Sequence, residues 1–141
     1  MGFSKKNYCQ FGFSLIELLV TLAIVGILAA ILYPSYKADV ARVHRNNAAV
    51  LLVNTAGQME QYYLKNTKYT GATLANLGID ASVCQNFYQI NITANTDTYL
   101  LEAMPIGWQA KSDEKCGTLS LTQDGKKSIS GSGDVSDCWY E

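Results

Sequence analysis

One long apolar segment with a single acid constrains this chain more than any other feature. From Phe13 to Leu32 there are 20 residues, and Glu17 is the only charged one. A helix that spans a membrane needs about 20 residues. Because a charged side chain near the centre of a bilayer costs about 2.5–3.5 kcal/mol, a carboxylate in such a segment indicates a specific role.

The stretch before this segment is short and basic. Residues 1–12 contain Lys5 and Lys6, include no acid, and end at Gly12. An ordinary secretory signal is cleaved after its apolar region, whereas the only suitable site here, after Gly12, precedes it. A lipoprotein signal is excluded because no apolar region precedes Cys9. An uncleaved signal anchor, with its basic end kept in the cytoplasm, stays open as an alternative.

The order of Gly12, Phe13, Glu17, the apolar stretch and the Tyr33-Pro34 pair resembles the processing site of type IV pilins and of type II secretion pseudopilins. This resemblance implies that a prepilin peptidase cleaves between Gly12 and Phe13 and methylates the new amine of Phe13. It also implies that Glu17 meets the N-terminal amine of a neighbouring subunit. The simpler alternative for Glu17 is stabilisation by the helix dipole, worth about 0.3–1 kcal/mol.

Length and charge set the expected organisation. We expect a leader at 1–12, a transmembrane or filament-core helix at 13–33, and one periplasmic or surface globular domain at 34–141. The leader holds two of the 11 basic residues and none of the 12 acidic ones, which leaves nine positive and twelve negative side chains. This balance argues against wholesale electrostatic binding of nucleic acid, although not against a local basic patch.

Cysteine usage indicates an oxidising compartment for the globular part. Cys9 falls in the leader, whereas Cys84, Cys116 and Cys138 lie beyond the apolar segment, and disulfides persist in the periplasm and at the cell surface. Spacing alone does not choose the pair. The segments around Cys116 and Cys138 resemble the C-terminal loop of pilins, especially the PilE-like minor pilins, and this resemblance implies a Cys116–Cys138 disulfide. Cys84 is then a single thiol, with a buried structural role as one interpretation.

The first half of the chain predicts one long helix from Phe13 to Lys65, with a kink at Pro34, which lacks an N–H group. Beyond Pro34, apolar residues recur at helical spacing and predict a stripe that packs on a sheet. The members of that stripe are Ala48, Leu52, Ala56, Met59 and Tyr63. We expect a loop at 66–86, with a short helical turn at 72–77.

The second half predicts an antiparallel sheet of about four strands. The expected strands are 87–93, 98–104, 117–122 and 127–130, with a hairpin turn at 123–126 that uses Asp124-Gly125. A Gly- and Ser-rich loop at 131–137 then leads to Cys138. The expected fold class is therefore α+β, with a long N-terminal helix packed on the sheet. The resemblance implies that this is the type IV pilin fold, with a disulfide-closed C-terminal loop.

Residues that could carry chemistry are few. The only histidine, His44, lies beside Arg42 and Arg45, and we interpret it as part of a solvated helix face. No spacing suggests a metal site, a cofactor or catalytic residues. Lys126 and Lys127, together with Lys111 and Lys115, could form a small basic patch for nucleic acid; solubilising lysines beside an edge strand are the alternative. Further candidate contact residues are Trp108, Trp139 and Tyr140, of which Trp108 is expected on the sheet.

The resemblance to type IV pilins implies a structural protein without enzymatic activity, a minor pilin of a type IV pilus. The expected partners are other pilin subunits, the prepilin peptidase, inner-membrane assembly proteins and, before assembly, membrane lipid. The chain would cross the inner membrane once, with its N-terminus in the cytoplasm, and later lie in the extracellular pilus. Two alternatives stay open: a type II secretion pseudopilin, although the major pseudopilins usually carry a calcium site in place of the disulfide loop, and a DNA-binding pilin used in DNA uptake. A role in adhesion, twitching or DNA uptake is not encoded in any single residue.

Overall fold

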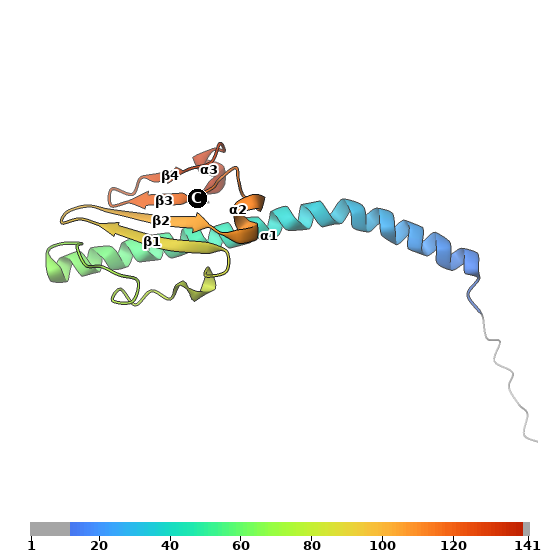
Figure 1. Ribbon diagram of the computed structural model, residues 1–141, viewed down its shortest axis with the longest axis horizontal. Helices are drawn as coiled ribbons and strands as arrows, with labels where there is room; N and C mark the ends of the chain where they lie inside the picture. Colours follow the sequence, from blue (N-terminus) through green and yellow to red (C-terminus); the bar gives the residue numbers. More distant parts are fainter. Residues whose placement is uncertain (1–11, 140–141) are drawn as a thin grey trace, which may run out of the picture. The chain divides into compact units, whose positions relative to one another are not determined.

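The computed structural model describes residues 12–139, apart from the side chains of Pro34 and Val83. The basic leader up to residue 11, with Cys9, lies outside the described residues, as does Tyr140. The chain divides into two compact units, Met1–Ser35 and Tyr36–Glu141. In chain order the elements are α1 (Leu15–Asn66), η1 (Ala81–Val83), β1 (Tyr88–Ala94), β2 (Tyr99–Pro105), α2 (Gly107–Ser112), β3 (Leu119–Thr122), β4 (Lys127–Ile129) and α3 (Val135–Cys138) (Figure 1).

The long helix predicted for residues 13–65 is confirmed as α1, which has 52 residues. At its start the Ser14 carbonyl accepts the amides of Glu17 and Leu18 at 3.1 and 3.2 Å. At its end Thr67 adopts a φ of 57° and donates its amide to the Tyr63 carbonyl, which closes the last turn in the manner of a left-handed cap. The helix assignment runs through position 34, and the kink at that position stays a prediction.

The sheet has four antiparallel strands in the order β1-β2-β3-β4, as the alternating sequence predicted. Its register pairs Ile92 with Leu101, Leu101 with Leu121, and Leu121 with Lys127. Alternate residues of β2 and β3 are buried because they face α1. The core of the second unit contains Ala48, Leu52 and Met59 from α1 and Tyr99, Leu101, Ala103, Leu119 and Leu121 from the sheet. Apolar burial between one helix face and one sheet face therefore stabilises this unit.

Three short elements differ from the sequence-based expectation. The short helical turn expected at 72–77 is present as a single hydrogen-bonded turn, closed by the Leu77 amide on the Thr73 carbonyl at 3.0 Å. It is followed by η1, which was not expected and in which the Asp80 carboxylate accepts the Ser82 amide at 2.9 Å. The helix α3 occupies part of the segment 131–137 that was expected to be a loop, and α2 lies between two expected strands where no element was predicted. Four to six residues are too few to show helical periodicity.

Candidate functional site

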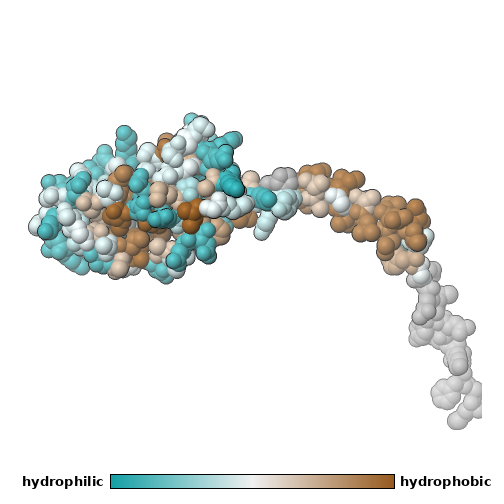
Figure 2. Space-filling model, in the orientation of Figure 1, coloured by the Kyte–Doolittle hydropathy of each residue, from teal (hydrophilic) through white to brown (hydrophobic). Residues whose placement is uncertain are grey.

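The N-terminal half of α1 carries the residues expected to act in processing and assembly. Gly12 and Phe13 are exposed, with 81% of Phe13 accessible, and Glu17 lies in the first helical turn. The large apolar side chains from Leu15 to Leu32 are all exposed, and this part of α1 is almost continuously hydrophobic at its surface (Figure 2). By length and composition the helix could cross a membrane. This surface calls for an apolar environment, which lipid or other helices would provide.

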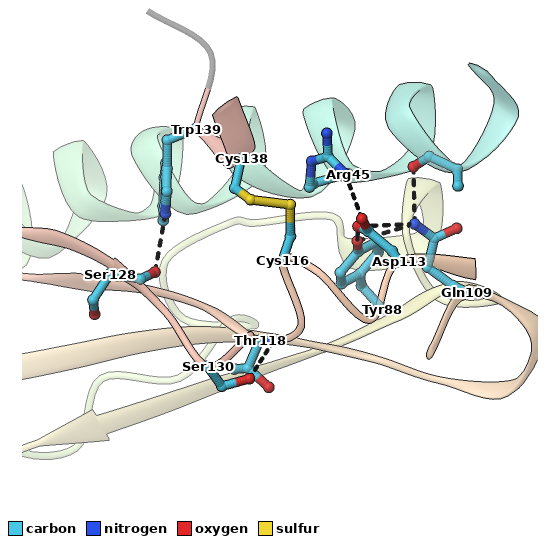
Figure 3. Close-up of a disulfide and its surroundings, with 11 residues drawn as sticks. Arg45, Tyr88, Gln109, Asp113, Cys116, Thr118, Ser128, Ser130, Cys138 and Trp139 are labelled. Carbon is cyan, nitrogen blue, oxygen red and sulfur yellow. Dashed lines mark hydrogen bonds and ion pairs between the residues drawn. A yellow bond between two sulfur atoms is a disulfide. The ribbon is translucent and has the colours of Figure 1, made fainter. Parts of the chain in front are cut away.

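The C-terminal loop is closed by the predicted disulfide. Cys116 and Cys138 are bonded, with their Cα atoms 5.6 Å apart and both side chains buried (Figure 3). The loop also pairs with the preceding segment through backbone hydrogen bonds, from the Gly133 amide to the Lys115 carbonyl at 2.7 Å and from the Gly131 amide to the Cys116 carbonyl at 3.1 Å. At Gly131 a Cβ atom would lie 2.2 Å from the Lys115 carbonyl oxygen. Only glycine permits this close approach.

Trp139 fixes the end of the loop against β4. Its indole Nε1–H donates to the Ser128 carbonyl at 3.0 Å, and its side chain is almost completely buried (Figure 3). The Lys127 ammonium lies 5.7 Å from the centre of the indole ring, within cation–π range. Trp108 differs from its expected place on the sheet, since it lies on α2 and is 37% exposed. Of the two tryptophans, Trp108 is therefore the one accessible to a partner.

A buried polar cluster that no sequence pattern predicted joins α1 to α2 and β1. Arg45 forms an ion pair with Asp113, and the Tyr88 hydroxyl donates to the other Asp113 oxygen at 2.9 Å (Figure 3). The Gln109 amide donates to the Ala41 carbonyl at 2.8 Å and to the Tyr88 hydroxyl at 3.0 Å. Burial raises the pKa of the Tyr88 phenol, so this group stays a hydrogen-bond donor. These polar contacts hold α1 against α2 and β1, elements that are far apart in the sequence.

His44 is not on a solvated face, contrary to the sequence interpretation. Its ring stacks on Phe87 with centroids 3.5 Å apart and an interplanar angle of 17°. The histidine is half-buried because the segment leading into β1 packs over this turn of α1. Cys84 is buried and unpaired, and burial raises the pKa of its thiol. Both groups therefore have structural surroundings rather than catalytic ones.

The lysines suggested as one basic patch separate into two groups. Lys126 and Lys127 lie at the β3–β4 turn, whereas Lys111 is on α2 and Lys115 precedes β3, at the opposite end of the sheet. The β3–β4 turn and the β1–β2 turn lie at the same end of the sheet. The Tyr69 amide donates a hydrogen bond to the Thr96 carbonyl in the β1–β2 turn. We call this end the hairpin end. Its lysines are Lys65, Lys68, Lys126 and Lys127, and its acids include Asp97 and Asp124.

The described residues contain no group of three or more His, Cys, Asp or Glu side chains that could hold a metal ion. A cavity of about 790 Å³ lies between α1 and the disulfide loop. Its walls carry both signs of charge, from Arg42, Lys111, Glu114 and Asp137 among others.

Two family models match this chain. The model of the type IV minor pilin ComP, the DNA uptake sequence receptor, matches residues 34–120. The model of the prokaryotic N-terminal methylation motif matches residues 7–33. The crystal structure of the minor pilin PilV of Neisseria meningitidis aligns with 67% of this chain and 90% of its own length, at a TM-score of 0.52 and 20% identity. This structural likeness establishes the fold alone.

Curated relatives extend the comparison. A fimbrial protein of Moraxella nonliquefaciens is 32% identical over 133 residues, which cover 79% of this chain and 84% of the relative. The wide pilus major component PilA4 of Thermus thermophilus is 32% identical over 109 residues, covering 74% and 82%. The type IV major pilin PilE1 of Neisseria gonorrhoeae is 41% identical over 63 residues. That match covers 45% of this chain and 38% of the relative, so the chain spans about two fifths of the length of such Neisseria pilins.

Proposed function

Because this chain belongs to the type IV pilin family, we propose that it is a minor subunit of a type IV pilus, cleaved between Gly12 and Phe13 and assembled through α1. Type IV pilins are structural, non-enzymatic proteins that assemble with other pilin subunits. The observation that carries the proposal is the exposed apolar half of α1, with one carboxylate in its first turn. In a membrane this surface is solvated by lipid, and in a filament other helices replace the lipid.

Processing creates the charge that Glu17 needs. Cleavage after Gly12 releases an amine on Phe13, and methylation keeps that amine basic. In an apolar filament core an unpaired carboxylate is strongly disfavoured, and a neighbouring amine offsets much of that cost. Within residues 12–139 Glu17 forms no ion pair of its own. A partner from another subunit is thus the pairing that the proposal requires.

The test is the composition of sheared surface filaments. Mass spectrometry of wild-type filaments should find this protein beginning at a methylated Phe13 and containing the Cys116–Cys138 disulfide. Glu17→Ala should remain folded and membrane-inserted but be largely absent from the filaments, whereas Asp39→Ala, which removes an exposed acid farther along α1, should be incorporated normally. Filaments that contain the protein with Met1 intact would refute the processing step. Normal incorporation of Glu17→Ala would leave only the helix-dipole explanation.

A second function, reception of DNA for uptake, is favoured by one specific observation. The model that matches residues 34–120 describes a DNA uptake sequence receptor, and the hairpin end carries four lysines beside the carboxylates of Asp97, Asp124 and Glu60. Lysine–phosphate contacts release counterions from the DNA. For each such contact, the logarithm of the affinity falls by about 0.9 when the logarithm of the salt concentration rises by one. Binding at this end would therefore be strongly salt-dependent.

A gel-retardation assay at two salt concentrations tests this second function. The double variant Lys126→Gln with Lys127→Gln should weaken DNA binding. It should also reduce the slope of log affinity against log salt by the amount that about two phosphate contacts contribute. The matched control is Lys111→Gln with Lys115→Gln, which removes the same charge at the opposite end of the sheet. Equal losses from both pairs would indicate general charge attraction instead of a site, and no retardation by wild type would exclude the receptor function.

A further inference from the structure

The cavity between α1 and the disulfide loop is lined largely by charged side chains. Its volume of about 790 Å³ lies in the range of ligand sites, about 300–1,000 Å³. Apart from the Arg45–Asp113 ion pair, the lining has three cations and three anions: Arg42, Lys111, Lys115, Glu114, Asp134 and Asp137. Within residues 12–139 none of these six side chains forms an ion pair with another. The cavity therefore presents unpaired charges of both signs to a ligand.

The floor of the cavity is held in place by buried groups. The Arg45 side chain is 9% exposed and donates to the Asp113 carboxylate. The Cys116–Cys138 disulfide lies beside this pair (Figure 3). The Arg45 Nε–H is buried and has no hydrogen-bond partner among the described residues, which is uncommon for a buried donor. The floor thus carries an arginine whose hydrogen-bonding capacity the subunit itself does not fill.

Cations and acids come to the cavity from different elements. Arg42 is on α1 and Lys111 is on α2, which the Gln109 side chain bonds to α1. Asp134 precedes α3 and Asp137 lies in its first turn. The Asp134 carboxylate makes no capping hydrogen bond to α3. Two cations from one side and two acids from the other suit a ligand that carries both a negative and a positive group.

The cavity begins a short distance along the chain from the apolar segment. Leu32 ends that segment, and Ala38, which lines the cavity, follows six residues later, about 9 Å of helix. Aromatic residues that membrane interfaces favour lie nearby in the chain or on α2: Tyr33, Tyr36 and Trp108 are all exposed. Headgroups extend about 5–8 Å beyond the hydrocarbon core. When the apolar segment spans a membrane, headgroups are therefore close to the helix turn that begins the cavity.

We propose that this cavity binds the headgroup of a zwitterionic phospholipid, with the phosphate at Arg42 and Lys111 and the ammonium at Asp134 and Asp137. The proposal rests on the pilin function above, in which the apolar half of α1 lies in a membrane before assembly. Basic pockets beside membrane spans select anionic headgroups. Here the added acids shift the selectivity to a headgroup that also carries a positive charge. The bound lipid holds the cavity at the membrane surface until the subunit leaves the bilayer.

The first experiment measures lipid selectivity with the full chain in detergent. Native mass spectrometry is carried out with equal amounts of phosphatidylethanolamine and phosphatidylglycerol that have the same acyl chains. About five-fold more phosphatidylethanolamine should be bound, because only this lipid offers an ammonium to the acids. Equal binding would show general contact with lipid tails, and a preference for phosphatidylglycerol would show a simple anion site. Either result would overturn the proposal.

The cations are tested by a double variant. Arg42→Gln with Lys111→Gln should lower the binding of phosphatidylethanolamine about five-fold. The matched control, Lys126→Gln with Lys127→Gln, removes two positive charges outside the cavity and should change the binding less than two-fold. The disulfide, checked without reduction, should form in both. Equal losses in the two double variants would contradict a site at the cavity.

The acids are tested in the same way. Asp134→Asn with Asp137→Asn should remove the preference for phosphatidylethanolamine over phosphatidylglycerol, because the ammonium loses its partners. Asp97→Asn with Asp124→Asn, which removes two acids at the hairpin end, should leave the preference unchanged. A preference that survives the loss of Asp134 and Asp137 would overturn the assignment of the ammonium.

A second experiment identifies the source of the ligand. A photo-activated p-benzoylphenylalanine in place of Ser112, an exposed and uncharged residue of the cavity lining, should cross-link to phospholipid in membranes. The same probe in place of Gln123, at the β3–β4 turn, should do so about five-fold less. Cross-links only to protein would overturn the proposal. Displacement of phosphatidylethanolamine by an equal concentration of soluble glycerophosphoethanolamine would also overturn it, because the ligand would then be a free phosphate ester.

The lipid site and the pilus function can fail separately. Selective lipid binding by a protein that is absent from sheared filaments would contradict the pilus function and leave the cavity site standing. Presence in the filaments without any lipid selectivity in detergent would overturn the cavity site alone.

Discussion

The two halves of α1 contrast in what surrounds them. From Leu15 to Leu32 the helix has no buried large apolar side chain, although nearly every residue is apolar. In the second unit the same helix buries one face against the sheet and holds Arg45 in a buried ion pair. The first half is apolar on all sides and therefore needs an apolar environment from outside the subunit. The second half instead packs its apolar face in the core of its own unit.

This difference separates two kinds of stability. Substitutions in the second half should change the free energy of unfolding of the globular unit. Substitutions in the first half should change membrane insertion or assembly and leave unfolding untouched. Each prediction below is measured by urea unfolding of the detergent-solubilised chain, followed by tryptophan fluorescence, since Trp139 is buried in the core.

The largest effect is expected at the buried ion pair. Arg45→Met leaves the Asp113 carboxylate buried without its cation, and such a loss costs about 3–5 kcal/mol. The double variant Arg45→Met with Asp113→Leu removes both charges and should recover much of the loss. If Arg45→Met lowers the free energy of unfolding by less than about 1 kcal/mol, the ion pair does not contribute substantially to holding α1 in this unit.

Matched leucines test the contrast between the halves directly. Leu52 is completely buried and Leu19 is exposed. Leu52→Ala should lower the unfolding free energy by about 2–5 kcal/mol through lost burial and a residual cavity. Leu19→Ala should leave it unchanged. A comparable loss at Leu19 would mean that the first half contributes to the stability of the second.

High pH should weaken the second half through its buried phenols. Burial, followed by the hydrogen bond to Glu60, raises the pKa of Tyr69 to about 12, and burial also raises the pKa of Tyr99. An unfolded tyrosine loses its proton near pH 10, so between pH 10 and 12 the folded chain binds more protons. Stability is then complete below pH 10 and falls as pH rises toward 12. Tyr69→Phe should make this fall shallower, whereas Tyr36→Phe, at an exposed position, should not.

The smallest change in the free energy of unfolding is expected at Gly57, and the sign of that change is informative. Gly57→Ala should stabilise the globular unit by up to about 1 kcal/mol, since alanine is the better helix former and the site is open. Destabilisation by this substitution would show that position 57 is packed within the unit.

The regular parts of this fold could be predicted because their signals are periodic and long. The apolar run, the stripe from Ala48 to Tyr63 and the alternation in β3 each repeat a pattern over several residues. The Asp124-Gly125 turn was also recognisable from turn chemistry. The disulfide pairing came from resemblance, since spacing left other pairings open. The family itself was recognised from the order of Gly12, Phe13, Glu17 and the apolar stretch.

The buried polar cluster could not be predicted in the same way. Arg45 and Asp113 are 68 residues apart, and an arginine among exposed helix residues gives no local sign that it points inward. The prediction that His44 lies on a solvated face was wrong for a related reason, because Phe87 from a distant segment covers its ring. One weak signal existed: Arg45 lies four residues after Ala41 and three before Ala48, on the line of the buried stripe. Tertiary packing decides such positions, and one sequence seldom reveals it.

The disulfide has a mechanical consequence when the chain is stretched. Its sequence separation of 22 residues encloses β3, β4 and most of α3 in a covalent ring. If the unit is pulled open between α1 and Trp139, this ring withholds about 70 Å of extension, at 3.3–3.6 Å per residue. The strands inside it can separate but cannot be drawn out. Oxidation therefore sets how far a stretched subunit can lengthen.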